Sequence, residues 1–147
     1  MNRISAVIVS ALLAASAAPA FAGDCAPQVR EAWIRLVPGG MPMQAGFGRI
    51  ENRCPASATI VAASSPAYGS VELHETRIVD GVSKMRAVPE LRIAPDGTAT
   101  LKPGGLHLMM MQPHAPLKAG SKIAVEFELA DGRKILGEFE VRNPAAL

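Results

Sequence analysis

The sequence predicts an all-β fold, a sandwich or barrel of short and mostly antiparallel strands. Two observations support this prediction. No helical periodicity of apolar residues stands out after residue 22, and turn-forming residues recur about every ten residues, a spacing typical of such folds. The turn signals are Pro38-Gly39-Gly40, Asn52-Arg53, Ser64-Ser65-Pro66, Asp80-Gly81, Pro95-Asp96-Gly97, Pro103-Gly104-Gly105 and Asp131-Gly132.

The first element is a predicted signal peptide over residues 1–22. Arg3 is followed by an apolar run that is too short to span a membrane, and the segment closes on the small-x-small pattern Ala20-Phe21-Ala22. Cys25 is preceded by Asp24, not by the small residues of a lipoprotein signal. We therefore expect an exported protein without a membrane anchor, which in a Gram-negative bacterium is periplasmic.

Residues 23–147 are expected to form a single β-domain that acts as a monomer. The whole sequence has 15 basic and 13 acidic residues, and only Arg3 among them lies in the leader. The charges nearly balance and the basic residues do not cluster into a stripe, so nucleic acid is not an expected partner. No Ser/His/Asp or paired-carboxylate set indicates hydrolysis, and we expect a protein that is not an enzyme.

Nine strands are expected after the leader, two of them in one clear hairpin. The clearest hairpin lies within residues 121–142, where Ile123, Val125, Phe127 and Leu129 alternate with polar residues before Asp131-Gly132. That dipeptide is typical of a type I′ turn. Further strands are expected at about 30–37, 44–51, 57–63, 70–78, 82–88, 98–101 and 106–112.

Two cysteines remain in the expected mature chain, Cys25 and Cys54. An even count in an exported protein favours one disulfide. The spacing is not C-x-x-C, so thioredoxin-like redox chemistry is not indicated. The alternative is two free or separately used thiols.

The segment "LHLMMMQ", residues 106–112, places a histidine beside three consecutive methionines. In a strand, residues two apart share a face. Leu106, Leu108 and Met110 are then expected in the core. His107, Met109 and Met111 point the other way and place an imidazole beside thioethers.

Two further candidates lie upstream in a predicted hairpin. His74 and Met85 stand on either side of the Asp80-Gly81 turn. With His107 and Met109 they make a set of two imidazoles and two thioethers. Such soft ligands suit Cu(I) and are poor for zinc, magnesium or calcium. The set lacks the cysteine of a blue-copper site, which argues for holding copper rather than cycling it. The alternative is that these methionines are packing residues.

The spacing of the four residues resembles the pattern H-x10-M-x21-H-x-M of the PCuAC family of periplasmic copper chaperones. The surrounding segments "AWIRLVPGGMPMQAGFGRIEN", "VELHE", "LKPGGLHLMMM" and "PLKAG" also look like that family, over essentially all of residues 23–147. The resemblance implies a cupredoxin-like β-fold with a Cu(I) site near the surface. Its ligands, carried over by motif, are His74, Met85, His107 and Met109.

The resemblance also implies a role. Members of that family deliver copper to the dinuclear centre of cytochrome c oxidase subunit II, alongside Sco-type thiol proteins. We therefore expect a chaperone that passes Cu(I) by ligand exchange to such a partner. Two alternatives stay open: a periplasmic copper buffer or resistance protein, and a β-sandwich assembly module without a metal.

Several other residues are secondary candidates. Glu72 or Glu75 could orient the His74 ring, or both could be solvated surface carboxylates. Trp33 is expected to be a core anchor. The residues that could assist copper binding, against packing or loop roles, are Met41, Met43, Met111 and His114.

Overall fold

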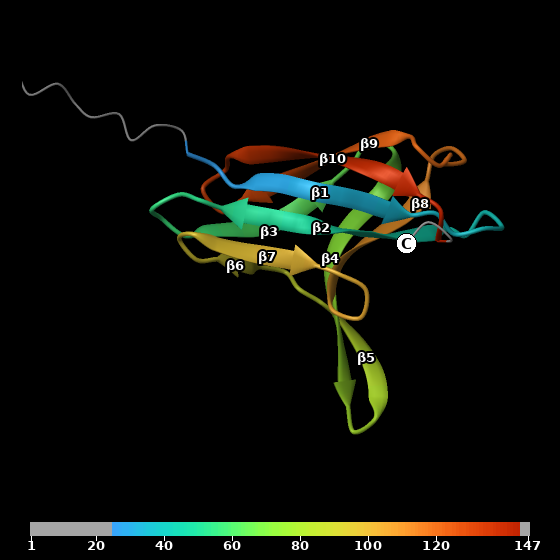
Figure 1. The fold of residues 1–147 in the computed structure, drawn as a ribbon, viewed down its shortest axis with the longest axis horizontal. Helices are drawn as coiled ribbons and strands as arrows, with labels where there is room; N and C mark the ends of the chain where they lie inside the picture. Colours follow the sequence, from blue (N-terminus) through green and yellow to red (C-terminus); the bar gives the residue numbers. More distant parts are fainter. Residues whose placement is uncertain (1–24, 145–147) are drawn as a thin grey trace, which may run out of the picture.

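A computed structural model describes residues 25–144, which form ten strands (Figure 1). The predicted signal peptide lies outside the described residues. Among the described residues, no helix is long and apolar enough to cross a membrane. The strands are β1 Gln28–Arg35, β2 Met43–Asn52, β3 Ala58–Ser64, β4 Tyr68–Val79, β5 Val82–Ala87, β6 Leu91–Ile93, β7 Gly97–Leu101, β8 Leu106–Pro113, β9 Lys122–Leu129 and β10 Lys134–Arg142.

Seven of these strands close into a barrel. Their order is β4-β8-β2-β1-β10-β9-β3, and β3 pairs again with β4. Within the described chain only β1 and β10 pair in parallel, and the other pairings are antiparallel. The short strands β6 and β7 add to β3 and β2 respectively. The predicted all-β, cupredoxin-like fold is confirmed.

Strand alternation fills the barrel interior with apolar side chains. On β8, Leu108 and Met110 are fully buried, as predicted, and Leu106 packs against the same cluster. Since successive side chains of a strand point to opposite faces, His107, Met109 and Met111 belong to the outer face of the barrel. The largest fully buried side chains are Phe127, Phe139, Ile34, Ile50, Ile60, Leu108, Met110 and Leu129.

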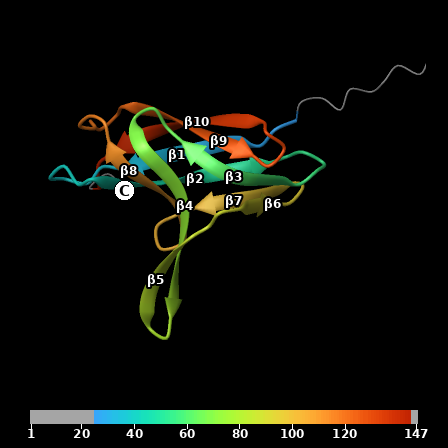
Figure 2. The same ribbon diagram turned by 180° about the vertical axis from the view of Figure 1, so that it is seen from behind.

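The hairpin of β4 and β5 projects away from the barrel as an arm (Figures 1 and 2). Every residue of β5 is exposed, whereas the first half of β4 belongs to the barrel wall. Asp80 and Gly81 connect the strands with φ values of 52° and 75°. Positive φ at both central residues is the mark of a type I′ turn.

Two expectations from the sequence were wrong, and one strand was missed. The hairpin at Asp131-Gly132 is not type I′, because only Gly132 has positive φ, and a three-residue connection is formed instead. Strand β6 was not predicted, since its three residues are too few to show alternation. Trp33 is not in the core: its ring packs on Phe47 at 4.6 Å between centroids, on the outer face, with the Arg35 guanidinium near both rings.

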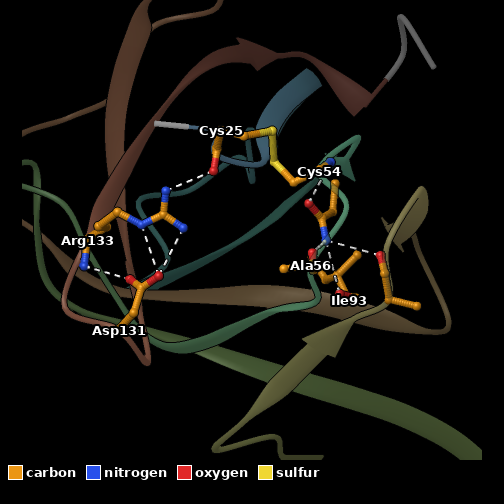
Figure 3. The surroundings of a disulfide bond; sticks show 8 residues. Cys25, Cys54, Ala56, Ile93, Asp131 and Arg133 are labelled. Atoms are coloured by element: carbon orange, nitrogen blue, oxygen red, sulfur yellow. Dashed lines mark hydrogen bonds and ion pairs between the residues drawn. A yellow bond between two sulfur atoms is a disulfide. The ribbon is translucent and has the colours of Figure 1, made fainter. Parts of the chain in front are cut away.

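The predicted disulfide between Cys25 and Cys54 is confirmed (Figure 3). It ties the segment before β1 to the turn after β2, with 5.7 Å between the two Cα atoms. Asn52 is fully buried next to it: its side-chain oxygen accepts from the Cys54 N–H, and its side-chain nitrogen donates to the carbonyl oxygens of Ala56 and Ile93. The disulfide and these hydrogen bonds together hold the end of β2 in place at this corner of the barrel.

Candidate metal centre

The two candidate histidines face each other across neighbouring strands. His74 of β4 and His107 of β8 are direct register partners, and their ring centroids lie 6.2 Å apart. They are far apart in sequence, and the β4–β8 pairing alone makes them neighbours. Two imidazoles side by side on one face can offer nitrogen lone pairs to the same ion.

The two candidate methionines lie on the same face as the histidines. Met109 is two residues along β8 from His107 and pairs with Glu72, itself two residues from His74. Met85 of β5 pairs with Thr76, two residues along β4 on the other side of His74. Since residues two apart share a face, the register places all four predicted ligands on one surface of the β5-β4-β8 ribbon.

His107 has one ring nitrogen committed to the backbone. The residue is only 5% exposed, and its Nδ1 lies 2.8 Å from the carbonyl oxygen of Gly105. A carbonyl can only accept, so Nδ1 carries the proton and Nε2 keeps its lone pair. Gly105 was not a candidate from the sequence, because a backbone acceptor leaves no side-chain signal.

In His74 the other ring nitrogen, Nε2, makes the hydrogen bond. Its Nε2 lies 2.9 Å from a carboxylate oxygen of Glu72, and its buried Nδ1 has no hydrogen-bond partner. With the Nε2 proton donated to Glu72, Nδ1 is left with a free lone pair. A histidine that ligates a metal through one nitrogen and donates from the other to a carboxylate is the usual arrangement at metal sites. The orphaned Nδ1 therefore fits a metal ligand.

Of the two carboxylates considered from the sequence, only Glu72 contacts His74. Glu75 instead binds two arginines of the arm, Arg77 and Arg86, at 2.9 Å each. Hydrogen bonds from Arg77 and then Arg86 lower the pKa of Glu75 below its ordinary value. Glu75 thus crosslinks β4 and β5 on the face away from the histidines.

Apart from the Glu72 carboxylate, which accepts a hydrogen bond from His74, the candidate metal ligands of this surface are nitrogen and sulfur atoms. Over residues 25–144 there is no group of three or more His, Cys, Asp or Glu side chains that could hold a metal ion. Any coordination by three or more side chains on this face therefore needs the thioethers. Imidazole with thioether is a donor set that suits Cu(I).

The secondary candidates separate into two places. Met43 is the direct register partner of Met111, on the same outer face as Met109. Met41 and His114 instead line a pocket of about 470 Å³ beside the loop after β1. The His114 Nδ1 is bonded there to the carbonyl oxygen of Pro66. His114 is thus a loop residue, as predicted, and the Met43–Met111 pairing was not foreseen.

Comparison with known proteins identifies a family to which this chain is similar. Residues 28–141 match the model of the family described as "Putative lipoprotein LpqE-like". A protein of Leifsonia xyli subsp. xyli, named as a putative lipoprotein, is 41% identical over 106 residues, which cover 71% of this chain and 63% of the relative. An uncharacterized Rickettsia prowazekii protein is 29% identical over 108 residues, covering 73% and 60%. The matches thus span about three fifths of these relatives' length.

Solved structures of PCuAC domains share the fold. The Cu(I) form of DR1885 from Deinococcus radiodurans in solution is 30% identical with a TM-score of 0.64, covering 82% of this chain and 83% of that one. The copper-bound PCuAC domain of PmoF2 has a TM-score of 0.65 at 15% identity, covering 79% and 92%. The second likeness concerns the fold alone.

Proposed function

The chain belongs to the LpqE-like family and is a PCuAC-type protein, and from this membership we propose that it is an exported chaperone that binds Cu(I). The proposed ligands are His74, Met85, His107 and Met109. The observation that carries the proposal is the pairing of His74 with His107, each with one ring nitrogen anchored and the other bearing a free lone pair.

The donor set explains the choice of metal and oxidation state. Thioethers are soft and neutral, so they add little for Zn(II) or for hard ions and favour Cu(I). Neither thioether needs to lose a proton, and both resist the disulfide formation that removes thiols in an oxidising compartment. A site of this kind can hold Cu(I) where a free cysteine pair would be lost.

Release of the ion follows from exposure. Met85 is 53% exposed on the projecting arm, whereas His107 is buried. An incoming thiolate of a partner can therefore replace Met85 first, while the other ligands keep hold of the ion. Thiolates bind Cu(I) more strongly than thioethers do, so copper passes downhill to such a partner by ligand exchange.

We propose cytochrome c oxidase subunit II, or a Sco-type thiol protein that serves it, as the acceptor, and the periplasm as the compartment. The description of the family, and of the Leifsonia xyli relative, as putative lipoproteins raises the question of a lipid anchor. A lipoprotein carries its lipid on a cysteine sulfur through a thioether bond. The sulfurs of Cys25 and Cys54 are bonded to each other, so neither is free to carry a lipid. Our proposal is a monomer that carries copper without an anchor.

The metal site is tested by anaerobic titration of residues 23–147 with Cu(I) against a chromophoric Cu(I) chelator. The wild type should take up one tight equivalent. The substitutions His74→Ala, Met85→Leu, His107→Ala and Met109→Leu should each weaken binding by at least about tenfold, or ~1.4 kcal/mol. Met110→Leu is the matched control, because Met110 is fully buried and should leave the affinity unchanged.

The outcomes separate the alternatives. Absence of tight uptake by the wild type would support an assembly module in which the methionines only pack. Delivery is tested in a copper-limited deletion strain, where loss of oxidase activity that added copper restores supports the chaperone role. Normal oxidase activity in that strain, with a site that binds copper in vitro, would favour a copper buffer or resistance protein.

A further inference from the structure

Most of the described methionines of this protein lie outside the core. Of the six in the described residues, only Met110 is fully buried in the core. Met85 and Met109 belong to the proposed copper site. Met41, Met43 and Met111 remain. Met41 lines the pocket beside the loop after β1, whereas Met43 and Met111 lie on the outer face of the barrel next to Met109. Met43 is 41% exposed there, although an apolar side chain on an outer face gains little from packing.

The strand pairing brings Met43 and Met111 close together. The N–H of Gln112 donates to the carbonyl oxygen of Pro42 at 2.8 Å. That bond flanks the Met43–Met111 pair, which identifies it as a non-hydrogen-bonded pair of the antiparallel ladder, the type with closer side chains. Their Cβ atoms are then about 4.5–5.5 Å apart.

Met109 completes a triangle with this pair. It pairs with Ala45, two residues along β2 from Met43, and therefore lies diagonally across from Met43. Diagonal neighbours of this kind are about 7–8 Å apart, within reach of long side chains. Three thioethers on one face can thus converge on a single soft ion.

We propose that Met43, Met109 and Met111 form a second, weaker position for Cu(I). The proposal rests on the function above, since Met109 is shared with the first site. The two positions are alternatives for one ion: copper leaves the two imidazoles while Met109 keeps hold of it. Met43 and Met111 replace His74 and His107, and Met85 dissociates, so the ion passes from four neutral ligands to three and stays Cu(I) throughout.

The gradient of exposure gives the second position its role. His107 is 5% exposed, Met109 and Met111 are partly buried, and Met43 is 41% exposed. Copper that moves along this row passes from a nearly buried nitrogen ligand to an exposed sulfur. The row is a path for entry and exit on the barrel wall, separate from the arm that carries Met85.

The test uses a His74→Ala/His107→Ala chain, in which the first site lacks both imidazoles. The protein is labelled with ¹³C at the methionine methyl groups and titrated anaerobically with Cu(I). The methyl signals of Met43, Met109 and Met111 should shift together, and that of core Met110 should stay in place. Adding Met43→Leu and Met111→Leu should eliminate this residual binding.

Met41→Leu is the matched control, since it removes an exposed thioether from the neighbouring loop without touching the triangle. It should leave the residual binding as it is. The inference is wrong if Met43 and Met111 do not shift in the double-histidine chain, or if the Met41 and Met43 substitutions act alike. Failure of the proposed function is a different result, namely no tight equivalent bound by the wild type.

Discussion

At the scale of residues, the hydrogen-bond acceptor beside each imidazole decides which of its ring nitrogens carries the proton. His107 donates its Nδ1 proton to a backbone carbonyl, and His74 donates its Nε2 proton to the Glu72 carboxylate. The free nitrogens are therefore different atoms in the two rings. Neighbouring Glu75 has no such role, although it is next to His74 in sequence, because its carboxylate binds Arg77 and Arg86.

This difference between the carboxylates predicts the effects of two matched substitutions. Glu72→Ala should weaken Cu(I) binding by about tenfold or more, since partners that orient metal-bound histidines typically contribute 10–100-fold to affinity. Glu75→Ala removes the same charge from the opposite face of β4 and should change Cu(I) affinity much less. Competition titration with a chelator measures both, and equal losses would show that the Glu72 contact acts only through charge.

At the scale of elements, the arm of β4 and β5 has little core to hold it. All of β5 is exposed, and the strand pairing from His74–Ala87 to Val79–Val82 keeps Met85 beside His74. Glu75 adds a crosslink, since it binds Arg77 on its own strand and Arg86 on the other. The crosslink lies on the face opposite Met85 and leaves the proposed copper-binding face free.

The crosslink predicts a pH dependence. Hydrogen bonds from Arg77 and Arg86 lower the pKa of Glu75, so its ion pairs are fully present above the ordinary glutamate pKa. They are lost as the pH falls through the lowered value. Carboxyl ¹³C NMR should show Glu75 titrating below the ordinary glutamate range, and Arg86→Gln should move its pKa upward. An unchanged Glu75 titration in that variant would contradict a crosslink between the strands.

At the scale of the whole molecule, the disulfide and the Met43–Met111 pair beside the proposed copper site lie at opposite ends of β2. The strand begins at Met43, beside Met111, and ends at Asn52, two residues before Cys54. The bond closes a loop with a sequence separation of 29. Stabilisation of the fold and binding of copper are therefore expected to be separable.

Removal of the disulfide tests that separation. Cys25→Ser/Cys54→Ser should lower the free energy of unfolding by about 3 kcal/mol, because the unfolded chain regains the entropy of an open loop. Cu(I) stoichiometry and affinity of the folded variant should stay as in the wild type. Denaturant unfolding and chelator competition measure the two quantities, and a large loss of affinity in the folded variant would show that the corner and the site are coupled.

The sequence alone determined much of this protein. Turn residues and period-two alternation predicted nine of the ten strands, because both signals depend on local backbone geometry and on which face of a strand is buried. The same alternation separated Met110 from His107 and Met109 on β8. The spacing of the four candidate ligands indicated the family, and the even cysteine count in a chain expected to be exported favoured the observed disulfide.

Tertiary structure decided what depends on strands far apart in the sequence. The order of strands in the barrel makes His74 and His107 partners and places Met43 opposite Met111, and no local pattern encodes that order. It also places Trp33 on the outer face, where Phe47 packs against it. The free nitrogens of the two imidazoles were likewise set by acceptors on the folded backbone and on Glu72, since a hydrogen bond exists only once its two partners have been brought together.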